Sequence, residues 1–142
     1  MTREDIVKEA LSWLGTPYRN HARVKGAGID CGQLLLAVYG SLGVLPKDFD
    51  VGYYPEQWHL HRDEEKYLGT VLAFGREIIG PPLPGDAVMF KFGRVFSHGG
   101  IVIEWPNIVH ALRPECTLDN VEQCIIGPKA LANLPRKYFS AF

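Results

Sequence analysis

The apolar pattern of the chain changes from helical to strand-like near the turn GPPLPGD at residues 80–86. Before this turn, apolar residues recur at helical spacing over residues 2–14 and 30–42. After it, short runs rich in β-branched and aromatic residues are bounded by Gly, Pro and Asn. Helices first and strands second predict an α+β domain with an antiparallel sheet.

The composition is that of a globular domain. The chain has 142 residues, of which 46% are hydrophobic and 22% charged, enough to bury a core. There is no internal repeat or low-complexity linker, so we predict a single domain over residues 1–142. The formal net charge is -1, without a basic stripe, which predicts neither a nucleic-acid partner nor membrane insertion. The N-terminus does not resemble a signal peptide, so we expect cytoplasmic synthesis.

The first predicted helix, residues 2–14, begins with Thr2 and Asp5, which resemble a capping box. Its expected apolar face consists of Ile6, Ala10, Leu11 and Leu14. For the second helix, residues 30–42, we expect Asp30 as the N-cap and Gly43 as the stop.

Further elements are expected later in the chain. Acidic residues at its start favour a third helix over residues 62–72. Strands are expected in the runs AVMFKF, GGIVIEW, IVHALR and VEQCIIG.

One cysteine lies where a loop of small residues becomes an apolar helix, in GAGIDCGQLLLAVYG at residues 26–40. A helix N-terminus presents unpaired N–H groups and a positive dipole end, which favour a thiolate and can stabilise an oxyanion. A structural buried thiol is the alternative interpretation. Cys31 is the candidate nucleophile, because Cys116 and Cys124 lack this setting.

Two histidines in consecutive predicted strands are candidates for a general base and its orienting group. His98 and His110 can share a sheet face, beside the helix that carries Cys31, if the loop has an odd length or a strand contains a bulge. A loop over residues 104–106 would set Gly100 opposite His110 and make His98 its diagonal neighbour. Otherwise the two rings point to opposite faces of the sheet, and the three residues cannot form one catalytic site.

These features form an ordered series of motifs along residues 3–113. They are GTPY (15–18), DC (30–31), PGDAVMF (84–90), HGGIVI (98–103) and IVHA (108–111). The series resembles that of the NlpC-type cysteine peptidases, which are papain-like cell-wall hydrolases. The resemblance implies a nucleophile helix packed on a small antiparallel, barrel-like sheet.

The resemblance also implies roles for individual residues. Cys31 would be the nucleophile, His98 the general base and His110 the third polar residue that orients the imidazole. Tyr18 would help to position the substrate or the oxyanion, and Asp30, which matches the family aspartate before the nucleophile, is assigned with it to substrate binding. On the sequence alone, Tyr18 is equally a turn aromatic and Asp30 a helix cap. No cofactor is implied.

The chain departs from the family pattern after the cysteine, where Ser-Gly is usual and Gly32-Gln33 stands here. This departure leaves oxyanion geometry and substrate preference open. The short chain with its aromatic segment YYPEQWHLHRDEEKYLG resembles the version encoded with phage or prophage tail genes. We therefore expect the peptidoglycan stem peptide and phage tail-tip proteins as partners, and the virion tail as a location. For Tyr53, Tyr54, Trp58 and His59, we favour ordinary core and covering roles.

The predicted activity is hydrolysis of a peptide bond in the peptidoglycan stem peptide. Three other classes fit the same residues: a thiol amidase or acyltransferase, a non-catalytic tail component, and a cytosolic binding module.

The remaining cysteines and histidines do not predict a metal site. No C-x2-C spacing occurs, and the close pair His59 and His61 is assigned to the surface. Cys116 and Cys124 are expected as two buried thiols rather than as a disulfide.

Overall fold

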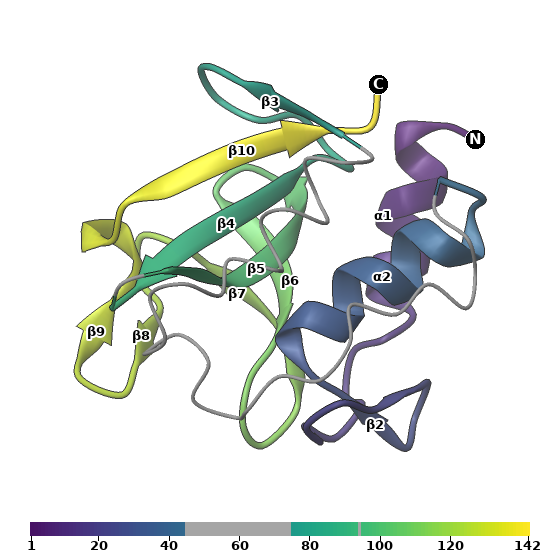
Figure 1. The fold of residues 1–142 in the computed structure, drawn as a ribbon, viewed down its shortest axis with the longest axis horizontal. Helices are drawn as coiled ribbons and strands as arrows, with labels where there is room; N and C mark the ends of the chain where they lie inside the picture. Colours follow the sequence, from purple (N-terminus) through teal and green to yellow (C-terminus); the bar gives the residue numbers. More distant parts are fainter. Residues whose placement is uncertain (45–74, 94) are drawn as a thin grey trace.

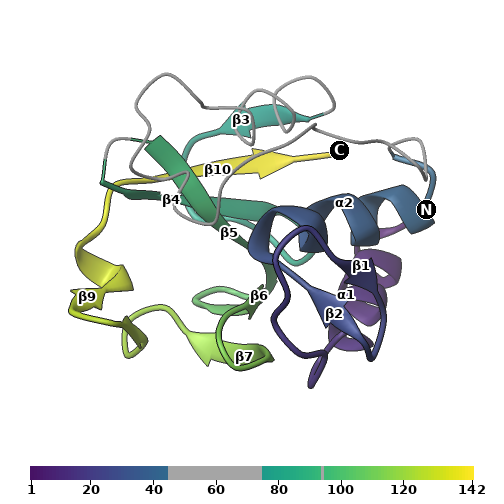
Figure 2. The same cartoon turned by 60° about the horizontal axis from the view of Figure 1, so that its bottom comes forward.

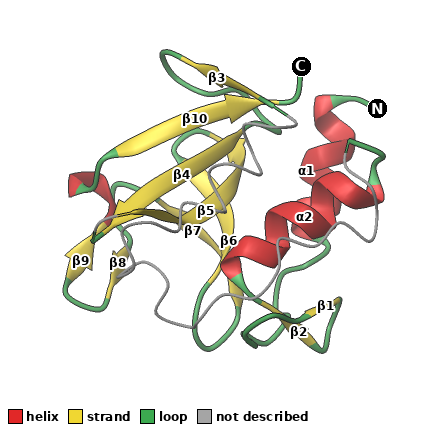
Figure 3. Ribbon diagram, in the orientation of Figure 1, coloured by secondary structure: helices red, strands yellow, loops and turns green. Residues whose placement is uncertain are grey.

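The computed structural model describes residues 1–44, 75–93 and 95–142. Within these residues, two α-helices precede most of the strands: α1 (Arg3–Leu11) and α2 (Cys31–Ser41). Figures 1 and 3 show the two helices together beside the sheet, with β8 and β9 on the side away from them. The predicted α+β class is therefore confirmed.

The main β element of the described residues is a six-stranded antiparallel sheet with the order β3-β10-β4-β5-β6-β7. Its strands are β3 (Arg76–Ile78), β4 (Ala87–Phe92), β5 (Val95–Glu104), β6 (Asn107–Ala111), β7 (Cys116–Asn120) and β10 (Arg136–Ser140). Two short hairpins pair β1 (Arg23–Val24) with β2 (Gly28–Ile29), and β8 (Ile125–Ile126) with β9 (Lys129–Ala130). A 3-10 helix, Leu131–Asn133, leads into β10, whose insertion between β3 and β4 is visible in Figure 2.

Helix α1 begins with the predicted capping box. The Thr2 N–H donates to Asp5 Oδ2 at 2.8 Å, and the Asp5 N–H donates to Thr2 Oγ1 at 3.2 Å. The helix ends at Leu11 instead of residue 14, because a turn follows. As a result Leu11 and Leu14 are exposed, against expectation, and Trp13 is buried in their place.

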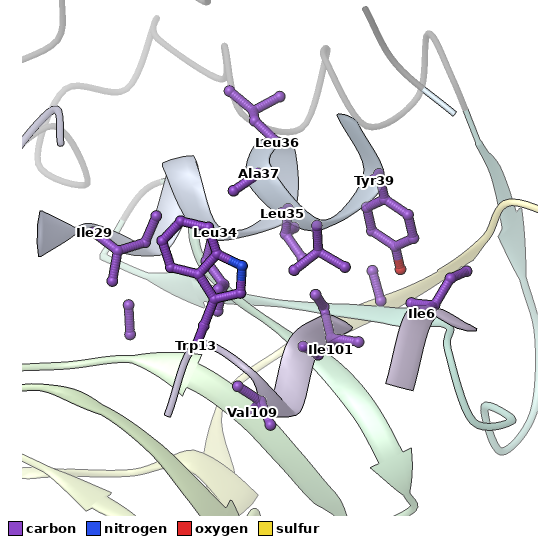
Figure 4. Packing of buried hydrophobic residues seen from close by; sticks show 14 of the residues in the cluster. Ile6, Trp13, Ile29, Leu34, Leu35, Leu36, Ala37, Tyr39, Ile101 and Val109 are labelled. Carbon is purple, nitrogen blue, oxygen red and sulfur yellow. The ribbon is translucent and has the colours of Figure 1, made fainter. Parts of the chain in front are cut away.

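The core between the helices and the sheet joins all the elements near the candidate cysteine. Figure 4 shows its close packing, with contributions from Ile6, Trp13, Ile29, Leu34, Leu35, Leu36, Ala37, Tyr39, Ile101 and Val109. Helix α2 is central to it: every residue from Cys31 to Gly40 is buried, more than the single apolar stripe that we expected.

The PGD turn anchors both helices to the sheet. Arg3 Nη1 donates to the buried Asp86 Oδ1 at 2.7 Å, and the Leu83 N–H donates to Asp86 Oδ2 at 2.9 Å. The Tyr39 hydroxyl on α2 donates to the Gly85 carbonyl at 2.8 Å. Gly85 has φ +88, and a Cβ there would lie 3.2 Å from the Arg3 carbonyl oxygen, so the turn requires glycine.

Other expectations are corrected or lie outside the described residues. The run VEQCIIG is not one strand: a turn occupies residues 121–123 and only Ile125–Ile126 is extended. The predicted helix over residues 62–72 and the aromatic segment 53–69 lie outside the described residues. Neither described helix is long and apolar enough to cross a lipid bilayer.

Candidate active site

The two histidines of the hairpin meet as the sequence predicts. Gly100 pairs with His110, and His98 Nε2 lies 2.9 Å from His110 Nδ1. The connection differs from the expected loop, because Glu104 and Asn107 are paired and Ile103 is the extra residue of a β-bulge. The bulge, rather than an odd-length loop, therefore brings the two rings to one face.

That face of the sheet is turned away from the helices, which corrects our expectation. His98 packs against Phe90 and Phe92, with ring centroids 6.2 Å and 5.6 Å away. Phe90 belongs to a second buried cluster, whereas Ile101 and Val109 on the opposite face pack in the cluster that contains α2. The two imidazoles are thus held by aromatic side chains and by each other.

Cys31 is the first residue of α2, and its sulfur contacts the strand that carries His98. The Sγ–H donates to the Ser97 carbonyl at 3.3 Å. The register between β4 and β5 shifts between Phe90 and Lys91, so Ser97 lies at a second bulge. This bulge places the carbonyl of the residue before His98 at the sulfur.

Cys31 and His98 open into one pocket of about 430 Å³. Each residue is only 8% exposed, although both line the pocket. The other lining residues are Tyr18, Phe92, Ser97, Ala111, Leu112, Arg113, Ile125, Ile126 and Gly127. This volume is in the range of pockets that enclose small ligands or a short segment of a larger one.

Asp119 extends the histidine pair and was missed by the sequence analysis. His110 Nε2 lies 2.8 Å from Asp119 Oδ2, which also accepts a hydrogen bond from Thr117 Oγ1 at 2.6 Å. Because His110 pairs with Thr117, Asp119 lies two residues further along the same face. The alternation of Thr117 and Asp119 in CTLDN was the available signal, and we did not predict this strand.

The charge states of these groups follow from their surroundings. Burial lowers the pKa of His98 well below its ordinary value, and His110 lowers it further. Burial also lowers the pKa of His110 despite its hydrogen bond to Asp119. Burial acts to raise the pKa of Asp119, but hydrogen bonds from Thr117 and His110 outweigh it and lower the pKa. At neutral pH, both imidazoles are therefore neutral and Asp119 is ionised.

These charge states determine the tautomers. A carboxylate can only accept hydrogen bonds, so His110 Nε2 carries the hydrogen that faces Asp119. The His110 Nδ1 is then an acceptor, and His98 Nε2 must carry the hydrogen between the rings. His98 Nδ1 is left with a lone pair and can act as a general base.

Cys31 is a thiol in this environment, which corrects the expectation of a thiolate. Burial raises its pKa, and the negative charge of Asp30 adds to the effect. Hydrogen bonds from the Gly32 N–H and the Tyr18 hydroxyl lower the pKa but do not offset the burial. The helix N-terminus alone therefore does not ionise the sulfur, which needs a base to accept its proton.

Tyr18 lies at the sulfur, where the sequence resemblance places it. Its hydroxyl hydrogen-bonds to Cys31, and its ring lines the pocket. Burial raises the pKa of Tyr18, so the phenol keeps its proton and remains a donor. The Arg113 guanidinium lies 4.8 Å from the centre of the ring.

Asp30 caps helix α2 and does not line the pocket. Its carboxylate is 1% exposed and accepts hydrogen bonds from the Gln33 N–H at 2.8 Å and the His21 N–H at 2.7 Å. It is therefore the N-cap of α2, and the assignment to substrate binding is corrected. The Gln33 side chain accepts from Arg23 Nε at 2.6 Å and does not line the pocket, whereas the N–H of Gly32, the other residue of this departure from the family motif, hydrogen-bonds the sulfur.

The other two cysteines are free and differ from each other. Cys116 is buried, as expected, whereas Cys124 is only partly buried. Cys124 lies near His110 and Asp119, outside the pocket.

Comparisons by sequence and by structure give different results. No protein-family model and no curated protein matches the sequence. Among solved structures, the chain is similar to the NlpC/p60 domain of the peptidoglycan hydrolase SagA, with 17% identity, a TM-score of 0.63, and coverage of 96% of this chain and 97% of that chain. It is also similar to NlpC1 from Trichomonas vaginalis, with 16% identity, a TM-score of 0.64, and coverage of 96% of this chain and 42% of that chain.

A third similar structure is RipD from Mycobacterium tuberculosis, a non-catalytic NlpC/p60 domain protein adapted to peptidoglycan binding. It has 10% identity and a TM-score of 0.59, and the match covers 99% of this chain and 97% of that chain. All three structures contain NlpC/p60 or NlpC domains, and their match spans nearly all of the present chain. The chain therefore has the papain-like α+β fold of NlpC/p60 domains.

Proposed function

We propose that this chain is a cysteine peptidase that hydrolyses a peptide bond in the peptidoglycan stem peptide. The observation that carries the proposal is the shared pocket of Cys31 and His98, with His110 and Asp119 hydrogen-bonded in series behind His98. The fold shared with the NlpC/p60 domain of a peptidoglycan hydrolase supports the cell wall as the substrate.

The geometry supports a stepwise mechanism. As the Cys31 sulfur attacks the scissile carbonyl, its proton passes to His98 Nδ1. The N–H groups at the start of α2, which already hydrogen-bond the sulfur, stabilise the oxyanion. His98 then protonates the leaving amine, and water activated by the same imidazole hydrolyses the acyl-enzyme.

The hydrogen bonds behind His98 support this reaction. When His98 becomes an imidazolium, its Nε2–H still donates to His110 Nδ1, and the carboxylate of Asp119 still accepts from His110. No tautomer has to change during the cycle. This arrangement has the same logic as a triad, with a second imidazole between the base and the carboxylate.

A second candidate function is peptidoglycan binding without hydrolysis. It is favoured by the burial that raises the pKa of Cys31 and by the similarity to RipD, a non-catalytic domain. The two candidate functions differ in whether the wild-type protein releases soluble fragments from purified peptidoglycan.

The test is digestion of purified peptidoglycan followed by mass spectrometry of the soluble fragments. We expect the wild type to release peptide fragments and Cys31→Ala to lose this activity, because the variant lacks the attacking sulfur. Its melting temperature will stay close to that of the wild type. Cys124→Ala, which alters a cysteine outside the pocket, is the matched control and will remain active.

The outcomes separate the alternatives. A wild type that sediments with the wall but releases no fragments supports the binding protein. Full activity of Cys31→Ala would exclude Cys31 as the nucleophile. Cleavage of a bond outside the stem peptide would indicate a different thiol amidase.

Delivery of the domain by a phage tail is a further part of the proposal. It is supported by the resemblance of the sequence to tail-encoded members. Co-purification of the chain with tail particles tests this part independently of hydrolysis.

A further inference from the structure

Three side chains of metal-binding type meet behind the histidine pair. His110 Nε2, a carboxylate oxygen of Asp119 and Cys124 Sγ all lie within 4.8 Å of one another. They come from consecutive parts of the chain: β6, β7 and the segment just before β8. One nitrogen, one oxygen and one sulfur are ligands that Zn²⁺ accepts, with water completing a tetrahedral site.

The backbone around these side chains is held in place. The Cys124 N–H donates to the Asn120 carbonyl at 3.0 Å, and the Cys124 carbonyl accepts from the Leu131 N–H at 3.0 Å. His110 is completely buried, whereas the Asp119 side chain is 36% exposed. The site therefore combines a buried ligand with a carboxylate that is in contact with solvent.

The distances between the ligand atoms require only a small rearrangement to bind an ion. Ligand atoms around a tetrahedral Zn²⁺ lie roughly 3.3–3.8 Å apart, given its bond lengths. The described separations, 2.8 Å between His110 and Asp119 and up to 4.8 Å for the set, bracket this range. A side-chain movement of about 1 Å brings the ligands to it. The carboxylate and a cysteine thiolate together neutralise the charge of the ion.

We propose that His110, Asp119 and Cys124 form a binding site for Zn²⁺ or a similar divalent transition metal, and that an ion bound there inactivates Cys31 and His98. The binding site stands on its own geometry, whereas its inhibitory effect rests on the proposed function. Binding replaces the proton of the Cys124 thiol, which is released to solvent.

Inhibition follows from the tautomers. A metal ion takes the lone pair of His110 Nε2, so the hydrogen of this ring moves to Nδ1. His110 Nδ1 then donates to His98 Nε2, and the hydrogen of His98 moves to its Nδ1. The nitrogen that would accept the Cys31 proton is now protonated, and the thiol has no base.

Binding is tested with Co²⁺ as a spectroscopic probe and Cys31→Ala as the starting protein, so that the pocket sulfur cannot act as a ligand. We expect a sulfur-to-cobalt charge-transfer band in Cys31→Ala that persists in Cys31→Ala/Cys116→Ala and disappears in Cys31→Ala/Cys124→Ala. Zn²⁺ should compete for the site and raise the melting temperature of the first two proteins only. Circular dichroism before metal addition shows that all three proteins are folded.

Two results would overturn the site. One is a band in the wild type that is already lost in Cys31→Ala, since the pocket pair would then be the metal site. The other is a band that survives in Cys31→Ala/Cys124→Ala. Neither result depends on hydrolysis, so the site can be judged even if the protein proves to be non-catalytic.

Inhibition is tested separately, on peptidoglycan. We expect Zn²⁺ to inhibit the wild type reversibly, with EDTA restoring activity. Cys124→Ala should stay active and need at least about tenfold more Zn²⁺ for the same inhibition, because one ligand is missing. Equal sensitivity of the two proteins would refute the regulatory role.

Discussion

The carboxylate of Asp119 does not line the pocket, and it acts on the pocket through two imidazole rings. As an acceptor without hydrogens, it determines the tautomer of His110 and, through it, that of His98. Thr117 holds the carboxylate in place and helps to keep its pKa low. A partly exposed carboxylate thereby determines which nitrogen of the buried His98 ring carries the hydrogen.

Replacement of Asp119 by Asn tests this effect at the residue scale. The amide of Asp119→Asn can donate to His110 Nε2, which allows the opposite tautomers of both rings. In the molecules with these tautomers, His98 Nδ1 carries a hydrogen and cannot accept a proton. We expect kcat on peptidoglycan fragments to fall at least about tenfold, less than the roughly 10²–10⁴-fold loss of a general base. KM and the melting temperature stay nearly unchanged, measured with EDTA present.

Thr117→Val is the matched control, because it removes the hydroxyl that supports Asp119 and leaves the carboxylate in place. Its loss in kcat should be clearly smaller. An unchanged kcat in Asp119→Asn would show that the carboxylate has no influence on His98.

How much of the site could be predicted differs between its residues. Cys31, His98 and His110 were predicted because each lies in a motif with a fixed place in the chain, and the structure brings Cys31 and His98 to one pocket with His110 against His98. Asp119 was not, because its role depends on the pairing of β6 with a strand that lacks a strong apolar alternation. The pKa of Cys31 was misjudged because the sequence shows the helix N-terminus but not the burial of the sulfur.

At the scale of elements, two β-bulges shape the site. One lies at Ser97 and places a carbonyl at the Cys31 sulfur, and the other lies at Ile103 and brings His110 to the face of His98. The sequence predicted the pairing of Gly100 with His110 but assigned it to the loop, because a bulged residue has no distinctive side chain. The pairing itself was predictable from the alternation of the strands.

At Gly100 the hairpin has little room for a side chain. A Cβ there would lie 2.9 Å from Ile108 Cδ1 and 3.0 Å from the Val109 carbonyl oxygen. We expect Gly100→Ala to lower the free energy of unfolding by about 1–3 kcal/mol, since overpacking forces the strands apart. Chemical denaturation measures this change.

The control for Gly100→Ala is Ile108→Val in the same background. Valine lacks the Cδ1 atom that is closest to the new Cβ, so the double variant should recover part of the stability. The contact with the Val109 carbonyl remains, and full recovery is not expected. A double variant less stable than the sum of the two single changes would contradict this account.

At the scale of the whole molecule, the helical and β parts are joined by the PGD turn as well as by the core. Arg3 of α1 pairs with Asp86, which precedes β4, and Tyr39 of α2 bonds the Gly85 carbonyl. The α+β class could be predicted from the change in apolar periodicity. The strand order could not be predicted, because β10 lies between β3 and β4 and no local sequence pattern indicates that position.

Arg3→Met tests this connection. Asp86 is fully buried and Arg3 is 30% exposed, so the variant leaves a buried carboxylate with one partner fewer. We expect the free energy of unfolding to fall by about 1–3 kcal/mol. The matched control is Lys25→Met in the pair of Lys25 with Glu9, whose side chains are 45% and 22% exposed. Its loss should be about 0–1 kcal/mol, and equal losses in thermal or denaturant melts would show that the PGD connection adds no particular stability.

The burial of the Cys31 sulfur also bears on how long such a centre survives outside a reducing cell. Peroxides oxidise thiolates, and a protonated sulfur that is 8% exposed offers them little of the reactive form. In the proposed mechanism, the Cys31 sulfur is kept protonated and becomes a nucleophile only when His98 removes its proton. The burial that makes the proposed mechanism depend on a base would therefore also slow oxidation of the sulfur.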